Sequence, residues 1–318
     1  MRAVIQDRYG PPDVIAVGDL PKPEPADDEI LVQVKAVSLN GSDRENLIGR
    51  PFYARVAGLR RPRNPVPGSD IAGIVVAVGS SVTEYAPGDE VFGELPGYRG
   101  ALAEFVATSP RLLARKPPSL SFSDAAAIPQ AGCIAFRATK GLGSGHRLLV
   151  NGAGGSGGAF VIGLAKHLGA AVTAVDRADK RDHMLRLGAD ETIDFAEQDW
   201  ADQRGRYDRI VDLVAHRSPY RAHKALRSGG TYLVVGGYTR VLLATALAGW
   251  TIGRSDGKRV KVLAVPQSRT ELEAVTALVT DGAVVPAVDR IYPLKEAPAI
   301  FERLAAGDNL GKVIVEVS

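Results

Sequence analysis

A glycine-rich segment in the middle of the chain places the strongest constraint on its fold. Residues 152–158 read Gly-Ala-Gly-Gly-Ser-Gly-Gly, between an apolar run at 148–150 that predicts a strand and a helix predicted over 158–168. Glycines let the backbone turn sharply and approach a pyrophosphate, whose charge is stabilised by free N–H groups at the start of a helix. The spacing fits GxGxxG from Gly152, with a second frame from Gly155. We predict a dinucleotide-binding turn; the alternative is a tight strand–helix turn without a ligand.

The end of the next predicted strand bears on the choice of cofactor. Asp176 lies about 20 residues beyond the glycines, where a carboxylate accepts hydrogen bonds from the ribose hydroxyls of NAD and repels the 2′-phosphate of NADP. Arg177 and Lys180 favour NADP, because both can pair with that phosphate. Alternatively, Asp176 caps the following helix and the two cations face solvent. These residues do not decide whether the cofactor is NAD or NADP. The predicted cofactor-binding residues are Gly152, Gly154, Gly155, Ser156, Gly157, Gly158, Asp176, Arg177, Lys180, Gly236 and Gly237.

The chain around the glycine segment alternates between strand and helix patterns. Ser119 to Asp124 predicts a capped helix start, and a last helix is predicted over 269–280. This alternation predicts a parallel, doubly wound α/β sheet with right-handed crossovers. The predicted elements are strands at 147–150, 171–175, 210–214, 231–235 and 260–265, and helices at 158–168 and 179–187.

The first third of the chain follows a different pattern. Short valine-rich runs at 29–37 and 71–79 are bounded by glycine, proline and aspartate, which is typical of strands separated by turns. A final strand is predicted over 311–317. We therefore expect a β-rich domain interrupted by a nucleotide-binding domain: 1–122 for its first part, 123–266 for the nucleotide-binding domain and 267–318 for its second part.

Charge and composition exclude several classes of function. The 39 basic and 36 acidic residues give a net charge of +3, too small to indicate a partner among nucleic acids or membrane surfaces. No apolar run reaches the roughly 18 residues of a membrane span, and the first residues do not resemble a signal peptide. We expect a cytoplasmic protein. With one cysteine, Cys133, and no metal-ligand spacing among five histidines, no zinc site is expected.

Short motifs occur along the whole chain. They are Val66-Pro67-Gly68-Ser69-Asp70, Pro87-Gly88-Asp89-Glu90-Val91, Gly100-Ala101-Leu102-Ala103-Glu104-Phe105, Ala126-Ala127-Ile128-Pro129, the glycine segment, Leu187-Gly188-Ala189-Asp190 and Gly311-Lys312-Val313-Ile314. Together they resemble one family, the medium-chain dehydrogenases/reductases, and within it the zinc-free quinone oxidoreductase (zeta-crystallin-like) group. The resemblance implies a GroES-like catalytic domain around a Rossmann domain, a homodimer that pairs through the strand near 260–265, and a preference for NADPH.

The resemblance also supplies two candidate catalytic residues. Asn40 stands where zinc-dependent relatives have their first catalytic ligand, and in the family the matching residue contacts the nicotinamide ribose or the substrate carbonyl. Tyr53 is a candidate hydrogen-bond or proton donor, since a phenol is protonated at neutral pH. The alternatives are a turn residue for Asn40 and a packing aromatic for Tyr53. Asp43 is expected to fix the local loop.

Without a Lewis acid, hydride transfer is expected to an acceptor that is already electrophilic. We predict an NAD(P)H-dependent, zinc-independent reductase of quinones or α,β-unsaturated carbonyl compounds. Two alternatives remain open. One is an enoyl-thioester reductase of a biosynthetic pathway. The other is a degenerate relative that binds the cofactor but acts as a binding or regulatory protein.

Overall fold

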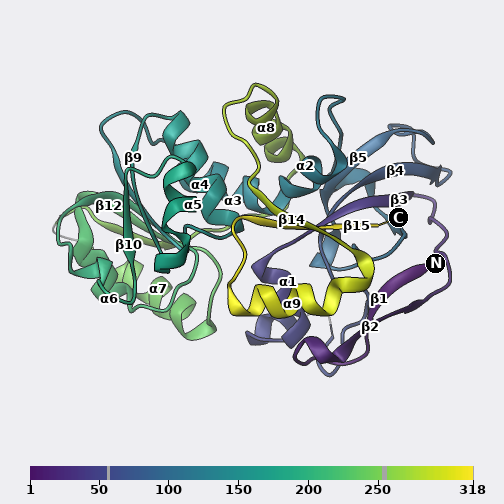
Figure 1. The fold of residues 1–318 in the computed structure, drawn as a ribbon, viewed down its shortest axis with the longest axis horizontal. Coiled ribbons are helices and arrows are strands. Elements are labelled where there is room, and N and C mark those ends of the chain that lie inside the picture. The colour runs from purple at the N-terminus through teal and green to yellow at the C-terminus, as the bar shows by residue number, and fades with distance from the viewer. Residues whose placement is uncertain (56–57, 253–255, 318) are drawn as a thin grey trace. The chain divides into compact units, whose positions relative to one another are not determined.

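A computed structural model describes residues 1–55, 58–252 and 256–317, which form two compact units. Unit 1 contains residues 1–133, 267–281 and 288–318, and unit 2 contains 134–266 and 282–287 (Figure 1). Unit 1 is therefore assembled from separate parts of the chain. Helix α2 and the first residues of α3, expected in the nucleotide-binding domain, pack within unit 1.

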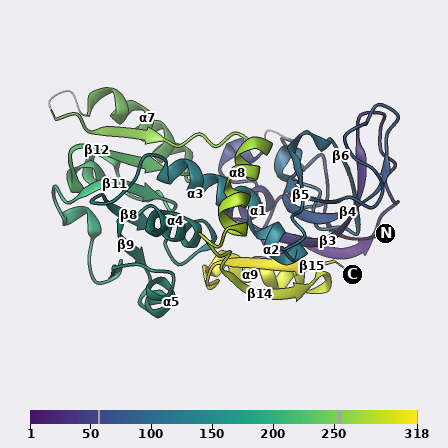
Figure 2. The ribbon, with the colours of Figure 1, turned by 90° about the horizontal axis from the view of Figure 1, so that it is seen from above.

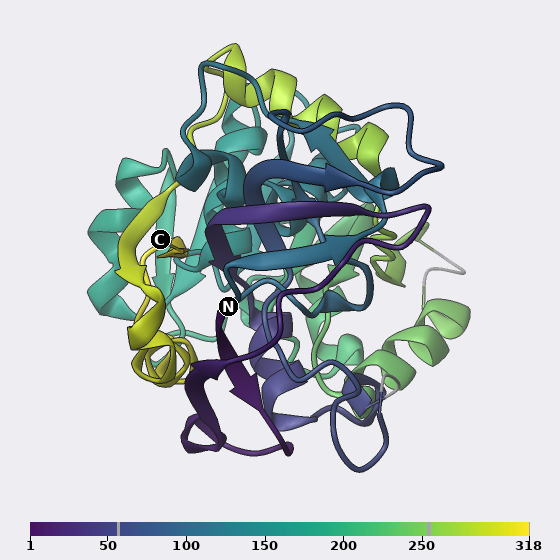
Figure 3. The same cartoon turned by 90° about the vertical axis from the view of Figure 1, so that its right-hand side faces the viewer.

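Unit 1 is built on a seven-stranded mixed sheet with the order β14-β15-β3-β4-β5-β7, and β6 pairs with β3. The final strand lies between the β14 edge and β3, so the end of the chain completes a sheet whose first strand in the sequence is β3 (Figure 3). A separate hairpin joins β1 and β2. The strands are β1 (Arg2–Gln6), β2 (Ile15–Asp19), β3 (Ile30–Leu39), β4 (Asp70–Val78), β5 (Glu90–Glu94), β6 (Phe105–Thr108), β7 (Leu113–Arg115), β14 (Val288–Pro293) and β15 (Lys312–Glu316).

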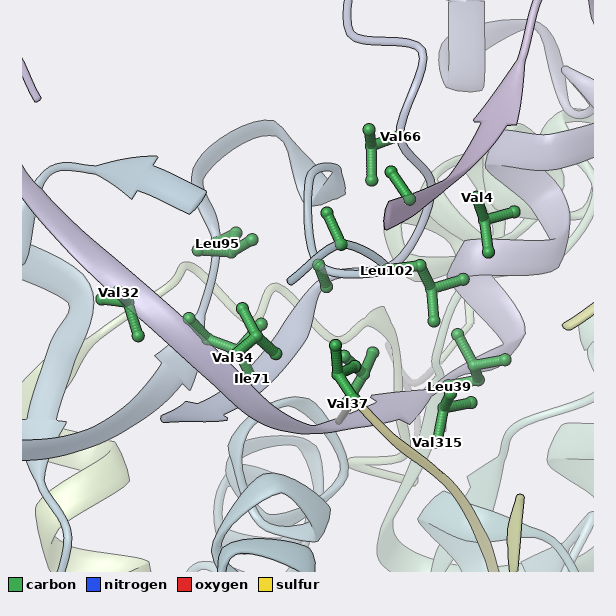
Figure 4. Packing of buried hydrophobic residues seen from close by; sticks show 14 of the residues in the cluster. Val4, Val32, Val34, Val37, Leu39, Val66, Ile71, Leu95, Leu102 and Val315 are labelled. Atoms are coloured by element: carbon green, nitrogen blue, oxygen red, sulfur yellow. The ribbon is translucent and has the colours of Figure 1, made fainter. Parts of the chain in front are cut away.

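The core of unit 1 forms around β3. Val32, Val34, Val37 and Leu39 of this strand are fully buried, and side chains from β1, β4 and β15 surround them (Figure 4). Both faces of β3 are covered, which explains why its sequence is almost continuously apolar instead of alternating. This packing fixes the end of β3, where Asn40 follows.

Four helices and the start of a fifth complete unit 1. Ser121 caps α2 by accepting a hydrogen bond from the Asp124 N–H at 3.0 Å, as the sequence predicts. Pro129 starts α3, so α2 and α3 are separate helices at the position where a kink is expected. The helices are α1 (Gly41–Ile48), α2 (Phe122–Ala127), α3 (Pro129–Thr139), α8 (Arg269–Thr280) and α9 (Ala297–Ala306).

Unit 2 contains a six-stranded, all-parallel sheet with the order β10-β9-β8-β11-β12-β13. Helices α4 and α5 lie together against β8, β9 and β10, and α6 and α7 lie together against β12 and β13 (Figures 1 and 2). The doubly wound α/β class is thus confirmed. The strands are β8 (Arg147–Asn151), β9 (Ala171–Asp176), β10 (Glu191–Asp194), β11 (Tyr207–Asp212), β12 (Leu226–Val234) and β13 (Arg259–Val262), and the helices are α4 (Ser156–His167), α5 (Arg181–Arg186), α6 (Pro219–Ala222) and α7 (Thr239–Thr251).

Several element ends differ from the predicted ones. Strand β11 stops at Asp212 instead of residue 214, because the Asp212 carboxylate accepts the N–H groups of Val214 and Ala215 and turns the chain. Helix α4 starts at Ser156, two residues earlier than predicted, and β13 ends at Val262 instead of residue 265. No helix in the described part of the chain is long and apolar enough to cross a membrane.

Candidate active site in two parts

The glycine turn, residues 152–158 of unit 2, connects β8 to α4. Gly152 has a φ of +83°, a conformation that favours glycine, and a Cβ on Gly158 would approach the Gly152 carbonyl oxygen to 2.4 Å. These two glycines are required for the turn to close on itself. A Cβ on Gly157 would meet only Leu213, at 3.5 Å, so the fold itself does not require a glycine there. An open position at the start of a helix is what close approach of a phosphate requires.

Asp176 binds the turn directly. Its Oδ2 accepts the N–H of Gly154 at 2.9 Å, and its Oδ1 accepts the N–H of Arg177 at 2.9 Å. The buried Lys180 lies over the same turn, with its Nζ 3.8 Å from Asp176 Oδ1. Its aliphatic stem would meet a Cβ on Gly154 at 2.6 Å. The carboxylate therefore supports the turn through its Oδ2 atom.

The other predicted cofactor residues lie at neighbouring positions of unit 2. The guanidinium of Arg177 pairs with Asp179 at 2.9 Å. Gly236 and Gly237 follow β12 with φ values of +65° and +99°, so the chain turns away from the sheet at its carboxyl edge. All of these residues follow the carboxyl ends of β8, β9 and β12, the edge at which parallel sheets bind ligands.

Sequence reasoning did not identify a buried polar group at the point where the strand order of this sheet reverses. Asn151 ends β8 and donates from Nδ2 to Asp212 Oδ1 of β11 at 2.7 Å, while the Tyr232 hydroxyl donates to Asp212 Oδ2 at 2.7 Å. Burial and the Asp212 carboxylate raise the pKa of Tyr232, which keeps its phenol a donor. The sequence does contain a signal for this group, because Asn151 and Asp212 are polar residues that each end an apolar strand.

A separate candidate site is in unit 1, at the start of α1. Asn40 follows β3, and its N–H donates to Asp43 Oδ2 at 2.7 Å, so Asp43 fixes the loop as expected. The Asn40 side chain donates from Nδ2 to Asp70 Oδ2 at 2.9 Å, and its Oδ1 accepts a hydrogen bond from Lys312 Nζ at 2.7 Å. All four residues are buried. The side chain of Asn40 is thus bound at both ends.

Gln130 extends this group towards two further elements. Its N–H donates to Asp70 Oδ2 at 3.3 Å, its Oε1 accepts the Ser42 hydroxyl at 2.8 Å, and its Nε2 donates to Glu94. We call the group the Asn40 cluster. Its members are Asn40, Asp43, Asp70, Glu94, Gln130 and Lys312. Of these, only Asn40 was predicted as a site residue, and Asp43 was expected to fix the loop. The other four, Asp70, Glu94, Gln130 and Lys312, were not predicted, although Asp70 and Lys312 lie in motifs of the family resemblance.

Burial changes the acidity of the cluster. It raises the pKa of Asp43 to about 7, with a further contribution from the charge of Asp70. Burial likewise raises the pKa of Glu94 to about 8, again with a contribution from Asp70. The pKa of Lys312 is lowered by burial, and Asp70 beside it opposes that change. The cluster therefore holds protons on carboxyl groups at neutral pH.

Zinc does not fit the donors of this cluster. An ammonium group occupies it at 2.7 Å from Asn40 and 3.5 Å from Asp70, and its members include neither a thiol nor an imidazole. Zinc in proteins is bound chiefly by such ligands. In the described part of the chain, no group of three or more His, Cys, Asp and Glu side chains has a metal-binding arrangement.

Tyr53 lies apart from the hydrogen bonds of the Asn40 cluster. It belongs to a short 3₁₀ helix, Phe52–Arg55, and its hydroxyl donates to Glu45 Oε2 at 3.0 Å. The side chain is 40% exposed, and burial of the ring raises the pKa of Tyr53 above its usual value. Tyr53 is a protonated donor at neutral pH, with Glu45 as a partner.

A β-rich unit interrupted by a parallel nucleotide-binding unit defines a class of oxidoreductases, and comparison with known proteins identifies the family. Residues 26–118 match the alcohol dehydrogenase GroES-like domain, and residues 187–315 match a family described as zinc-binding dehydrogenase. The chain belongs to the medium-chain dehydrogenase/reductase family, in its quinone oxidoreductase group, which confirms the resemblance seen in the sequence.

Relatives of this chain cover nearly all of it. It is 32% identical to 2-methylene-furan-3-one reductase of Solanum lycopersicum, over 99% of this chain and 79% of that protein. It is 31% identical to the NADPH-dependent alkenal/one oxidoreductase, chloroplastic, of Arabidopsis thaliana, again over 99% and 79%. The solved quinone oxidoreductase of Coxiella burnetii has 29% identity and a TM-score of 0.90, over 100% of this chain and 99% of that one. The protein is therefore an oxidoreductase.

Proposed function

We propose that this protein reduces quinones or α,β-unsaturated carbonyl compounds by hydride transfer from NADPH or NADH. The observation that carries the proposal is the Asn40 cluster, which offers amide, carboxyl and ammonium groups and contains neither a thiol nor an imidazole. Such a site does not polarise an alcohol for oxidation, but it suits an acceptor that is already electrophilic. The names of the relatives in tomato, Arabidopsis and Coxiella support this class of acceptor.

In this proposal, unit 2 holds the dinucleotide. The N–H groups at the start of α4, from Ser156 to Gly158, stabilise the pyrophosphate, and Gly157 allows its close approach. Asp176 accepts hydrogen bonds from the ribose, while Arg177 and Lys180 offset part of its repulsion of a 2′-phosphate. When bound, the nicotinamide supplies the hydride. We expect weak discrimination between the two cofactors, with NADPH slightly preferred.

Unit 1 supplies the polar groups for the acceptor. We assign to Asn40 a hydrogen bond to the substrate carbonyl or to the nicotinamide ribose, because its carboxamide is held rigidly between Lys312 and Asp70. Tyr53 is assigned the role of a donor to the oxygen that becomes negatively charged, since its phenol keeps its proton at neutral pH. Both assignments concern hydrogen bonds that stabilise charge at an oxygen atom.

An acceptor screen tests the proposed function. Oxidation of NADPH and NADH, followed by absorbance, is measured with a panel of quinones, enones and enoyl thioesters. We expect turnover of quinones or enones, with the Gly157→Val variant as a negative control that lacks cofactor binding. Turnover of enoyl thioesters alone would favour the biosynthetic alternative. Tight cofactor binding without turnover of any acceptor would favour a binding or regulatory protein.

We also propose a homodimer that forms through β13, in the cytoplasm. Strand β13 is an edge of its sheet, and α7 packs against it with Leu243, Leu247 and Trp250 largely exposed along one side. An open strand edge beside an apolar face favours pairing with a second copy. Sedimentation velocity should give twice the chain mass, and Leu247→Glu should shift the protein towards monomer. A monomeric wild type would contradict the proposal.

A further inference from the structure

Lys312 is the least expected charged group in unit 1. Its side chain and that of Asp70 are both fully buried, with Nζ 3.5 Å from Asp70 Oδ2 and 2.7 Å from Asn40 Oδ1. Burying an ion pair costs so much solvation that apolar residues of similar volume often stabilise a protein equally well. Stability alone therefore gives no reason for this pair beside Asn40.

The pair imposes one orientation on the Asn40 carboxamide. Lys312 has only donors and contacts the amide oxygen, whereas Asp70 accepts from the amide nitrogen at 2.9 Å. If the carboxamide rotated by 180°, its NH₂ group would face the ammonium and its oxygen would face the carboxylate. Both hydrogen bonds would become repulsive contacts. A neutral pair of partners would discriminate far less between the two orientations.

The main chain reinforces the same arrangement. The Asn40 N–H is bound by Asp43, and the Gln130 N–H donates to Asp70 Oδ2, so the carboxylate is itself fixed from the start of α3. Within the described residues, Asp70 Oδ1 is buried without a hydrogen-bond partner, so every hydrogen bond that Asp70 accepts converges on Oδ2. That oxygen is the one that binds Asn40.

We propose that Lys312 and Asp70 are positioning residues that hold the Asn40 carboxamide in the single orientation needed for hydride transfer. This inference rests on the proposed function, in which Asn40 binds the acceptor or the nicotinamide ribose. Lys312 acts only through Asn40 and does not touch the reacting atoms. A misplacement of about 1 Å in such a group lowers a rate by about 10²-fold.

A double-mutant cycle distinguishes positioning from a purely structural role. Lys312→Met should lower kcat by about 10²-fold, and Asn40→Ala should lower it by a similar factor. In the Asn40→Ala background, Lys312→Met should cause no further loss, because its effect passes through the missing carboxamide. The matched control is Lys116→Met, which removes another buried lysine of unit 1, paired with Glu90 at 2.9 Å. It should lower stability but leave kcat unchanged.

A second variant and a second measurement test this inference independently of the proposed function. They also avoid the possibility that Lys312→Met loses activity because it unfolds. The double variant Lys312→Met with Asp70→Asn leaves no isolated buried charge, so it should fold and still show the loss of kcat. The Asn40 side-chain NH₂ signals, assigned by NMR against Asn40→Ala, should exchange with solvent about tenfold faster in both Lys312 variants.

The outcomes are distinct. Equal losses of kcat from Lys312→Met in the wild-type and Asn40→Ala backgrounds would overturn the inference, and so would unchanged Asn40 NH₂ signals. If no acceptor is reduced by the wild type, the proposed function fails. In that case, altered NH₂ signals in Lys312→Met would still support the fixed orientation of Asn40, and unchanged signals would overturn it.

Discussion

The glycine turn of unit 2 and the Asn40 cluster of unit 1 differ in which atoms provide their polar groups. In the turn, the polar groups are backbone N–H groups at the start of α4, and Gly157 keeps the approach to them open. In the cluster, buried side chains from β4, β15 and the start of α1 meet half-buried ones from β5 and the start of α3. The first arrangement suits an anion, in line with the proposed pyrophosphate site. The second holds one carboxamide in one orientation.

The difference also concerns how each region tolerates charge. Asp176 at the turn is balanced by Lys180 and by two backbone N–H groups. The Asn40 cluster contains three carboxyl groups and one ammonium group, so its balance depends on protons held by Asp43 and Glu94.

The largest effect is expected at Gly157. Replacement by valine places methyl groups where a pyrophosphate must approach the start of α4, while Leu213 remains at an ordinary contact distance. We expect cofactor affinity to fall by more than about 10³-fold, or ~4 kcal/mol, with an unchanged melting temperature. Fluorescence titration with NADPH and NADH measures it. Gly143→Val, at another open glycine of unit 2, is the control. Unchanged affinity in a folded Gly157→Val protein would make the turn purely structural.

The second effect is on stability as a function of pH. The pKa of Asp43 is about 7 in the folded protein and 3.8 by reference, so the folded state binds the extra proton between these values. Its contribution is complete below pH 4 and is lost as pH rises through 7. We expect the free energy of unfolding to fall by about 3 kcal/mol between pH 4 and 8. Urea unfolding at several pH values measures it.

Asp43→Asn should remove the part of the slope that Asp43 contributes, because the asparagine oxygen still accepts the Asn40 N–H without a proton. The part that comes from Glu94, whose pKa is also raised, should remain. Asp28→Asn, at an exposed acid of the same unit, should leave the slope unchanged. A slope unchanged in Asp43→Asn would show that the proton is not held at this carboxyl group.

A smaller effect is expected at Asp176. Asp176→Ser should shift the ratio of NADPH to NADH affinity towards NADPH by about tenfold, ~1.4 kcal/mol, because it removes a charge that repels the 2′-phosphate. Affinity for both cofactors should also fall, since the Gly154 N–H loses its acceptor. Asp176→Asn keeps an acceptor oxygen, so it should shift the ratio without the common loss. Loss of NADPH affinity alone would contradict this role.

The smallest effect is expected on removing metal. Since the Asn40 cluster holds an ammonium group and lacks thiolate and imidazole ligands, chelators should leave reductase activity unchanged. Elemental analysis should find less than stoichiometric zinc in the purified protein. One zinc per chain would overturn the interpretation of the cluster.

The glycine turn, the α/β class and the family could all be predicted from the sequence alone. These depend on local signals: glycines at fixed spacing, apolar runs of strand length and helix caps such as Ser121, each readable within about a dozen residues. Helix α8, predicted over 269–280, has those bounds in the structure. The family resemblance identified Asn40 as a candidate residue, but it did not show which residues bind the Asn40 side chain.

Only the tertiary structure decided the environment of Asn40. Lys312 is 272 residues from Asn40 along the chain, and the pairing of β15 with β3 brings them together. A lysine followed by valine and isoleucine carries no sign of burial, and neither Glu94 nor Gln130 has a local pattern that predicts a shared hydrogen bond. Burial and pairing depend on sheet order, which is set by contacts between distant segments. The orientation of a single carboxamide is therefore a property of the folded unit.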